Sequence, residues 1–305
     1  MTKVFVIILN WNQADLTLEC LESVSKLDTL GYQLNVVVID NGSTDDSLKK
    51  LSKFKTIHNS TNLGFAAGNN VGIKYALAQG TDYIMILNND TIVHPNLVSN
   101  LLNSAKDSKV GAISPMIYFA KGFEFHKDRY KKNDLGKVIW YGGGKMDWKN
   151  VYGSARSVDK VDKQSLPLRG KGQFKKPEDT DFATGTCMFL SAKAIEEVGM
   201  FDEKYFMYYE DTDLSMRLKK AGYRVLFDPK GVVWHKVAQS SGIGSELNDY
   251  YTTRNRMFFG MKYASLRTKF ALARESIKLL LNGRKWQRTG TKDYYLGNFG
   301  RGSWK

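Results

Sequence analysis

The chain has 305 residues, of which 42% are hydrophobic, 12% aromatic and 25% charged, and this composition excludes a largely disordered protein. No stretch approaches about 18 uninterrupted apolar residues, so we expect no membrane-spanning helix. Two cysteines, Cys20 and Cys187, are too few for a disulfide framework. The small number of cysteines and the lack of a secretory signal pattern at the N-terminus together predict a cytoplasmic protein.

The formal net charge of +14 is concentrated near the C-terminus. Residues 254–305 contain thirteen Lys and Arg against two acidic residues, a net +11. Such an excess favours an anionic partner, such as nucleotide phosphates, nucleic acid or a lipid surface. A nucleic-acid-binding protein is therefore the alternative from a different class, although the chain contains no recognised nucleic-acid motif.

Apolar strands and amphipathic helices alternate through the first third of the chain. The predicted strands are 4–9, 36–39, 56–58 and 83–87, and the predicted helices are 15–30, one that starts near 43–46, and 65–79. This alternation predicts an α/β fold with a parallel, doubly wound sheet. The ligand crevice of such a sheet lies at the carboxyl ends of its strands.

The rest of the chain divides into three parts. Residues 121–179 show weak periodicity and are predicted to be a loop-rich insertion, with short strands, in a main domain of residues 1–240. The regular pattern returns with strands at 182–190 and 225–227 and helices at 192–198 and 213–221. Residues 241–305 are predicted to form a basic, amphipathic helical C-terminal region.

Polar or glycine residues follow each early strand. The first strand ends at Asn10 and Asn12, and the second at Asp40, whose carboxylate can accept the imide N–H of uracil or thymine. Gly64 and Gly68 surround a helix start and allow backbone N–H groups to approach a phosphate or sugar. Each feature alone is ordinary turn chemistry. Their convergence on one sheet edge favours a nucleotide site.

The fourth strand ends in Asn88, Asn89 and Asp90. A carboxylate at this place, close to a nucleoside diphosphate, would hold a divalent cation that bridges the phosphates. Mg²⁺ or Mn²⁺ suits oxygen ligands and often uses only one or two protein carboxylates. The structural alternative is that N-N-D-T begins the next helix, with Asp90 or Thr91 as its cap.

Seven sequence blocks, in order over residues 4–240, resemble the family-2 glycosyltransferases of GT-A fold, especially bacterial rhamnosyltransferase-like members. The blocks are V-I-I-L-N-W-N, V-V-I-D-N-G-S-T-D-D-S, N-L-G-F-A-A-G-N-N-V-G-I, I-L-N-N-D-T, T-G-T-C-M-F-L-S, V-G-M-F-D-E-K-Y-F-M-Y-Y-E-D-T-D-L-S-M-R-L-K-K-A-G-Y and V-V-W-H-K. The resemblance implies an inverting, metal-dependent enzyme that moves a sugar from a nucleotide-diphospho-sugar. The donor would be dTDP-rhamnose or a UDP-sugar, and the acceptor a hydroxyl of a cell-surface glycan or polyprenyl-diphosphate-linked precursor.

The resemblance also implies roles at matching positions. Asp40 matches the carboxylate that reads the base, and Asp90 the last acid of the metal-binding D-x-D motif. Asn88 stands where the first Asp of that motif would be, so we expect it to contact the ribose instead of the metal. Gly185 and Thr186 would lie near the acceptor or the diphosphate.

Asp211 matches the catalytic base of the family, and its neighbour Glu210 is the rival. Glycosyl transfer needs a carboxylate that takes the proton of the acceptor hydroxyl as it attacks. The structural alternative makes Asp213 the N-cap of the following helix, with the other two as solvated first-turn acids. We adopt that interpretation for Asp213 and predict Asp211 as the base.

Two further residues have open interpretations. His235 follows an apolar strand and is either a satisfied structural histidine or, as in related enzymes, a metal ligand or diphosphate contact. Arg254 belongs to a Y-Y-x-x-R-N element that also occurs in rhamnosyltransferase-like relatives. We predict that it contacts a diphosphate or an acceptor phosphate, and the alternative is a solvated cation.

After Arg254, aromatic and aliphatic residues interleave with Lys and Arg as far as Phe270. This pattern predicts a basic amphipathic helix, which either binds an anionic membrane surface or packs its apolar face on the catalytic domain. The first interpretation would make the enzyme peripheral on the inner face of the cell membrane. The sequence leaves the donor sugar, the linkage and the oligomeric state open.

Overall fold

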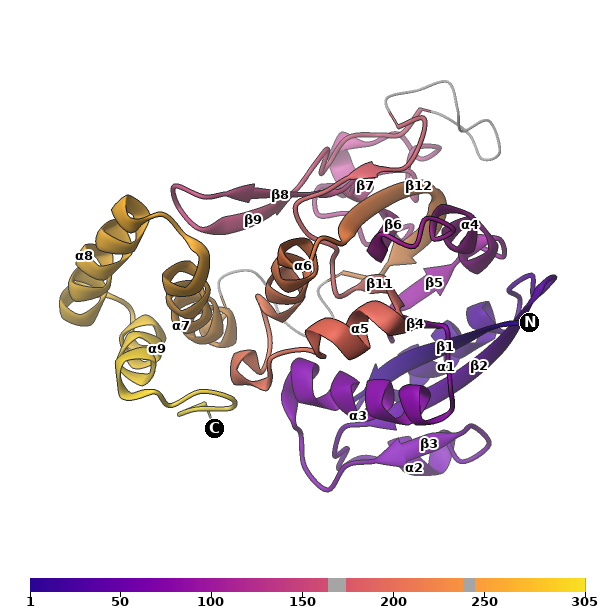
Figure 1. Cartoon of the computed structure of the whole chain (residues 1–305), viewed down its shortest axis with the longest axis horizontal. Coiled ribbons are helices and arrows are strands. Elements are labelled where there is room, and N and C mark those ends of the chain that lie inside the picture. The colour runs from indigo at the N-terminus through magenta and orange to yellow at the C-terminus, as the bar shows by residue number, and fades with distance from the viewer. Residues whose placement is uncertain (164–173, 238–244, 305) are drawn as a thin grey trace.

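A computed structural model of the chain describes residues 1–163, 174–237 and 245–304. Its centre is a ten-stranded sheet covered by helices on both faces, with further helices at one end (Figure 1). The strands are β1 (Thr2–Asn10), β2 (Tyr32–Asp40), β3 (Thr56–His58), β4 (Tyr83–Asn88), β5 (Thr91–Val93), β6 (Val110–Phe119), β7 (Ile139–Tyr141), β8 (Gly144–Asp147), β9 (Tyr152–Ala155), β10 (Glu178–Asp179), β11 (Cys187–Ser191) and β12 (Arg224–His235). The helices are α1 (Ala14–Val24), α2 (Ser47–Lys50), α3 (Gly64–Ala78), α4 (Leu97–Ser104), α5 (Ala192–Val198), α6 (Glu210–Lys220), α7 (Glu246–Tyr263), α8 (Leu266–Asn282) and α9 (Lys285–Leu296), with 3₁₀ turns η1 (Lys127–Arg129) and η2 (Glu203–Tyr205).

The strand order of the sheet is β10-β12-β6-β11-β4-β1-β2-β3, and β5 and β7 pair with β12 and β6 beside this path. Strands β4, β1, β2 and β3 are parallel to one another, as are β6 and β12. Strand β11 runs antiparallel between β4 and β6 and joins the two parallel blocks. The expected α/β fold with a mainly parallel central sheet is confirmed.

Residues 4–9 of strand β1 are all apolar because both faces of the sheet are covered. Val4, Val6 and Ile8 pack on the side of α1 and α4. Phe5 and Ile7 pack on the opposite side, with α3, α5 and α6. Successive side chains of a strand point to opposite faces, so a strand that is buried on both sides needs apolar residues at every position.

The register of the parallel strands aligns the residues at their carboxyl ends. Asn10 is opposite Asp40, and Leu9 is opposite Asn88. Beyond this edge, residues 91–93 form strand β5 instead of a helix, so the interpretation of Asp90 or Thr91 as a helix cap is wrong. The predicted polar cluster therefore lies at one edge of the sheet.

Three predicted helix boundaries are also wrong. The first helix ends at Val24 instead of residue 30. Helix α2 is only Ser47–Lys50, and Ser43 lies before it, where its backbone N–H donates to Asp40. Helix α6 begins at Glu210, so Asp213 lies inside its first turn and is fully buried instead of capping it.

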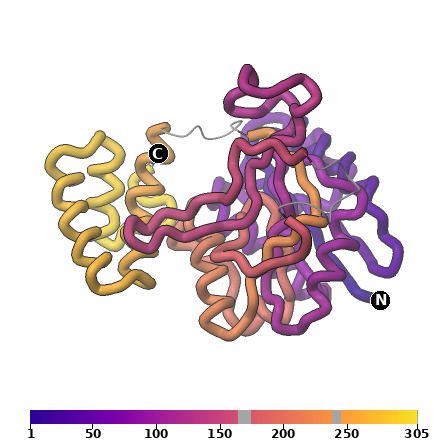
Figure 2. The backbone as a smooth tube through the Cα atoms, turned by 90° about the horizontal axis from the view of Figure 1, so that it is seen from above, coloured from indigo at the N-terminus to yellow at the C-terminus, as the bar shows by residue number. Residues whose placement is uncertain are grey.

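The predicted insertion does contain short strands. Strands β7 and β10 join the main sheet, whereas β8 and β9 form a hairpin that reaches toward the C-terminal helices (Figures 1 and 2). Residues 164–173 of this segment, and the boundary expected at 240–241, lie outside the described residues. Within the described part of the chain, no helix has both the length and the apolar character that a membrane crossing requires.

The basic C-terminal region is helical, as predicted, but it is divided. The chain leaves α7 at Ala264, and Ser265 caps α8 by accepting a hydrogen bond from the Thr268 N–H. Helix α7 packs on the hairpin, where Phe259 stacks on Trp148 with ring centroids 6.0 Å apart. The packing interpretation therefore holds for α7, and α8 lies further from the sheet (Figure 1).

Candidate active site

A cavity of about 450 Å³ opens where β1, β2 and β4 end. Five of the predicted ligand-binding residues line it, namely Asn12, Gly64, Asn88, Asn89 and Asp90. Aromatic side chains form much of the remaining wall: Trp11, Phe65, Phe206 and Trp304. A cavity of this size, lined by aromatic and polar side chains, is typical of a site for a small molecule.

A chain of hydrogen bonds runs along the strand ends beneath the cavity. The Asn89 amide donates to Thr17 Oγ1 at 3.1 Å, and the Thr17 hydroxyl donates to Asn10 Oδ1 at 2.7 Å. The Asn10 amide donates in turn to Asp40 Oδ2 at 2.9 Å. Thr17 comes from α1 and has no sequence signal for this role, because an ordinary helical threonine gives the same pattern.

Asp40 lies below the cavity wall and is fully buried. Its Oδ1 accepts from the Ser43 N–H at 3.0 Å and lies 3.0 Å from His58 Nδ1. Burial raises the pKa of Asp40, but the hydrogen bonds from Ser43, Asn10 and His58 outweigh it and hold the pKa below its ordinary value. The N–H of a uracil or thymine base would have to share Asp40 Oδ1 with His58, or displace the His58 ring. His58, half-exposed at the end of β3, is a candidate that the sequence did not indicate.

Asp90 and His235 are brought together by the antiparallel pairing of β5 with β12, in which His235 is opposite Thr91. His235 Nε2 is 3.1 Å from Asp90 Oδ1, and both side chains are about nine-tenths buried. Among the described residues, neither Asp90 Oδ1 nor His235 Nδ1 has a hydrogen-bond partner. Buried polar atoms without partners are uncommon and favour a missing ligand.

These two groups fit a divalent cation. Two ligands at adjacent corners of an octahedron with bonds of about 2.1 Å are about 3.0 Å apart, close to the 3.1 Å between Asp90 Oδ1 and His235 Nε2. The described residues contain no cluster of three or more acidic, histidine or cysteine ligands. A cation held here would therefore take its other ligands from phosphate oxygens and water.

The two glycines of the third block have different surroundings. Gly64 lines the cavity with a φ of +81°, and a Cβ there would lie 2.5 Å from the Phe206 ring. Gly68 does not line it, and a Cβ there would meet Leu9 at 2.7 Å and Asn41 at 3.0 Å. Gly68 was predicted to lie near the phosphate or sugar of the nucleotide. In the structure it instead allows close packing of α3 against β1.

Asp211 stands at the start of α6, next to the segment before β11. Its Oδ2 accepts from the Gly185 N–H at 2.9 Å, and its Oδ1 from the Thr212 N–H at 2.6 Å. A Cβ on Gly185 would lie 3.0 Å from the ring of Phe65, which lines the cavity. Glycine at position 185 thus lets this backbone pack against Phe65, whereas Asp211 itself is not among the residues that line the cavity. Burial raises the pKa of Asp211 despite the hydrogen bonds from Gly185 and Thr212.

The side chains of Glu210 and Thr186 are less accessible to a ligand than predicted. Glu210 is 5% exposed, and its Oε2 has no partner in the described part of the chain. Burial, and then the charge of Asp211, raise the pKa of Glu210 well above its ordinary value and so favour the protonated form of its carboxyl. Thr186 is buried and acts through its backbone, whose carbonyl accepts from the Asn88 N–H at 3.0 Å.

Residues 5–199, more than half of the chain, match the model of Glycosyl transferase family 2, and residues 164–293 match that of Glycosyl transferase family group 2. The chain belongs to glycosyl transferase family 2. N-acetylglucosaminyl-diphospho-decaprenol L-rhamnosyltransferase of Mycobacterium tuberculosis is 26% identical to it over 222 residues, which cover 68% of this chain and 68% of that protein. The low-salt glycan biosynthesis hexosyltransferase Agl10 of Haloferax volcanii is 26% identical over 194 residues, which cover 62% of this chain and 54% of that protein.

Solved structures agree on the GT-A fold. GalNAc-T7 with UDP, GalNAc and Mn²⁺ gives a TM-score of 0.67 at 18% identity, over 97% of this chain and 55% of that chain. The mannosyltransferase PcManGT from Pyrobaculum calidifontis, in complex with GDP-Man and Mn²⁺, gives a TM-score of 0.54 at 16% identity, over 96% and 74%. The enzyme is thus a family-2 glycosyltransferase of GT-A fold, as the seven sequence blocks predict.

The loop before α6 of this glycosyltransferase is strained. Phe206, Tyr208 and Tyr209 have φ values of +62°, +67° and +73°, in a region that bulky residues rarely adopt. The Asn255 amide holds this loop by donating to the backbone carbonyls of residues 205, 207 and 208 at 2.8, 2.8 and 3.0 Å. Strain of this kind persists only where the surroundings enforce it, and it is frequent at functional sites. Asn255 therefore helps to position the start of α6.

Arg254 is fully buried beside Asn255, and this placement corrects the prediction of a phosphate contact. Its guanidinium donates to the carbonyl of Tyr205 at 3.1 Å and lies over the rings of Tyr250 and Tyr251. Burial lowers the pKa of Arg254, although the tyrosine rings and hydroxyls partly oppose this. No surface of the guanidinium is open to a ligand here, so Arg254 joins α7 to the strained loop.

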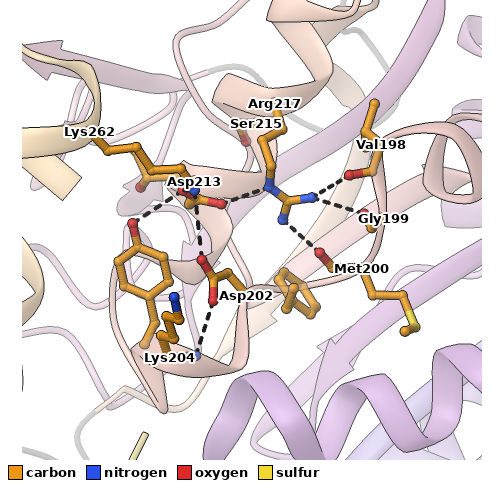
Figure 3. A network of polar contacts seen from close by, with 12 residues as sticks. Val198, Gly199, Met200, Asp202, Lys204, Asp213, Ser215, Arg217 and Lys262 are labelled. Atoms are coloured by element: carbon orange, nitrogen blue, oxygen red, sulfur yellow. Dashed lines mark hydrogen bonds and ion pairs between the residues drawn. The ribbon is translucent and has the colours of Figure 1, made fainter. Parts of the chain in front are cut away.

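Asp213 connects the C-terminal helices to α6 (Figure 3). Its carboxylate pairs with Arg217 Nε at 2.8 Å and with Lys262 Nζ of α7 at 2.7 Å. Burial raises the pKa of Asp213, but hydrogen bonds and charge from Lys262 and Arg217 lower it further, so the net shift is downward. Arg217 also donates to the carbonyl of Met200 at 2.6 Å. The sequence predicted a simple cap here, and the structure has a buried ion cluster.

Proposed function

We propose that this glycosyltransferase moves a hexosyl group, preferably rhamnose from dTDP-rhamnose, to a hydroxyl of a polyprenyl-diphosphate-linked glycan precursor. The observation that carries the proposal is the cavity at the strand ends, where Asp90 meets His235 beside the amides of Asn88 and Asn89. Transfer from a nucleotide-diphospho-sugar needs such a place for the diphosphate, next to a group that neutralises its charge. A UDP-sugar is the alternative donor, because thymine and uracil present the same imide.

Mg²⁺ or Mn²⁺ held by Asp90 and His235 would act as a Lewis acid on the departing diphosphate. The unpartnered Oδ1 of Asp90 beside the His235 ring supports this role, and so does the Mn²⁺ named with both structural neighbours. With only two protein ligands, metal binding would depend on donor binding. Asn88, whose side chain is an amide, would contact the ribose.

Asp211 would act as general base. Its raised pKa makes it a stronger base while it stays ionised, and its partial exposure leaves it accessible. Glu210 is almost completely buried and its surroundings favour its protonated form, so it is less suited to take a proton. Attack of the acceptor hydroxyl on the face opposite the leaving diphosphate gives inversion at the anomeric carbon.

The acceptor class is supported by the mycobacterial relative, whose name specifies a decaprenol diphosphate carrying N-acetylglucosamine. An acceptor of that kind is anchored in a lipid bilayer, so the enzyme would have to work at a membrane surface. Helix α8 has a suitable face. Four of its apolar side chains are largely exposed: Leu266 at 75%, Phe270 at 76%, Ile277 at 57% and Leu281 at 69%.

These side chains form one stripe. With about 100° between successive helical residues, they fall within a sector of about 60°. Arg267, Arg274 and Lys278 of the same helix are exposed beside it. An exposed apolar stripe beside cations is typical of helices that lie in the interface of an anionic membrane. We therefore propose a peripheral enzyme that binds anionic lipid through α8, on the cytoplasmic face where nucleotide sugars are available.

The test is a thermal-shift screen of dTDP-rhamnose, dTDP-glucose and several UDP-sugars with Mn²⁺, with short duplex DNA as the competing ligand. We expect at least one nucleotide sugar to raise the melting temperature, and only in the presence of the metal, because binding to the folded state alone stabilises it. Stabilisation by DNA with no response to any nucleotide sugar would contradict the proposal and favour a nucleic-acid-binding protein.

A further inference from the structure

The C-terminal segment Asn298–Trp304 returns from α9 to the cavity at the strand ends. Two of its residues, Arg301 and Trp304, line the same cavity as Asp90 and Asn88, although they are more than 200 residues away in sequence. Figure 1 shows this last part of the chain running from α9 toward the catalytic domain. The wall of the cavity is therefore completed by the end of the chain.

This segment is held in a specific conformation. The Ser303 N–H donates to Asp293 Oδ2 at 2.8 Å, and the Tyr251 hydroxyl donates to the carbonyl of Arg301 at 3.1 Å. Gly302 has a φ of +59°, and a Cβ there would collide with the Tyr250 hydroxyl at 2.0 Å. Only glycine fits such a position. The backbone of Arg301 is thus fixed on both sides.

The side chain of Arg301, in contrast, is exposed and has no hydrogen-bond or ion-pair partner for its guanidinium among the described residues. Of the described residues that line the cavity, Arg301 alone carries a positive charge and Asp90 alone a negative one. A fixed backbone with a free cation at a cavity is an arrangement that suits an anionic ligand, since guanidinium binds phosphate oxygens through two parallel hydrogen bonds.

We propose that Arg301 binds the diphosphate of the nucleotide, and that the C-terminal segment is a substrate-binding part of this glycosyltransferase. The inference rests on the proposed donor class. A nucleoside diphosphate bears two or three negative charges, and Asp90 with one divalent cation contributes a net charge of only +1. Arg301 supplies the further positive charge that the leaving diphosphate requires. It takes the role that the sequence assigned to Arg254, which is buried beneath this segment.

The test measures dTDP and UDP binding with Mn²⁺ by calorimetry for the wild type, Arg301→Gln and a matched control, Arg288→Gln. Arg288 is an exposed arginine of α9 outside the cavity lining, so its replacement removes the same charge. We expect R301Q to weaken nucleoside diphosphate binding about 10- to 100-fold, the range for a lost hydrogen bond to a charged group. R288Q should bind like the wild type, and Arg301→Lys should recover part of the affinity.

Binding of thymidine and uridine, which carry no phosphate, is measured by ligand-observed NMR. It shows whether R301Q changes the interaction with the charged diphosphate or the shape of the nucleoside site. Nucleoside binding should be unchanged in R301Q. Unchanged diphosphate affinity in R301Q would overturn the inference, as would an equal loss of nucleoside affinity, or a raised KM for a lipid-diphosphate acceptor alone. If the wild type binds neither dTDP nor UDP, the proposed donor class itself fails.

Discussion

The replacement of Asp211 by Asn, compared with that of Glu210 by Gln, distinguishes the two candidate bases. An amide at position 211 cannot accept from both the Gly185 N–H and the Thr212 N–H, which the carboxylate meets at 2.9 and 2.6 Å. One buried N–H then loses its partner, at a cost of about 1–3 kcal/mol in the free energy of unfolding. Loss of the base should reduce kcat by about 10²- to 10⁴-fold.

Glu210→Gln is the matched control. Glu210 is buried, does not line the cavity and has a raised pKa that favours its protonated form, so a neutral amide of the same shape should leave both stability and turnover close to wild type. The assay is release of nucleoside diphosphate with saturating donor and acceptor, well below the melting temperature of each variant. Affinity for dTDP or UDP should be unchanged in both.

The pH profile gives an independent check on Asp211. A general base must be ionised, so turnover falls as the pH drops through its pKa. Because the pKa of Asp211 is raised, the acid limb of the wild-type kcat profile should lie above the ordinary aspartate value of 3.8. Turnover of D211N within tenfold of wild type, or loss of turnover in E210Q alone, would refute the assignment.

Three other predictions follow from the ion cluster, the cation site and α8. Asp213 has a lowered pKa, so its contribution to stability is present above about pH 4 and is lost as the pH falls through the folded-state pKa. In urea unfolding, the difference in free energy of unfolding between the wild type and Asp213→Asn should therefore shrink below pH 4. A difference that does not change with pH would contradict this prediction. His235→Ala should weaken Mn²⁺ binding in the presence of dTDP or UDP by at least tenfold in calorimetry, and unchanged affinity would exclude ligation. Phe270→Glu with Ile277→Glu should abolish sedimentation with anionic liposomes at low salt but leave turnover of a water-soluble acceptor unchanged, and undiminished sedimentation would remove the membrane surface from α8.

The strand ends were predictable because their signals are local. A continuous apolar run identifies a strand that is buried on both faces, and parallel strands bring their carboxyl ends to one edge. Asn10, Asp40 and Asn88 are adjacent for that reason, as β1 pairs with β2 and β4 in register. The position of Asp90 beside His235 depends on the short β5–β12 pairing, which no local sequence pattern indicates.

The contributions of the C-terminal region were not predictable from local pattern. Arg254 and Arg301 are both arginines of the basic C-terminal region. Only the three-dimensional packing buries Arg254 and places Arg301 at the cavity. Asn255 acts on carbonyls about 50 residues away in sequence, which no periodicity reveals. The acidic run E-D-T-D is typical of a helix start and predicts Asp213 as a cap, but the helix begins three residues earlier, at Glu210.

The central claim is that the chain transfers a sugar from a nucleotide-diphospho-sugar by in-line displacement at the strand-end cavity. In the most direct measurement, the enzyme is incubated with Mn²⁺, a polyprenyl-diphosphate-linked acceptor and a dTDP- or UDP-sugar of known anomeric configuration, α or β. The product is then analysed by NMR for its anomeric configuration. We predict a product of inverted configuration, formed by the wild type and absent with Asp90→Ala. A product of retained configuration, or undiminished transfer by D90A, would contradict the account.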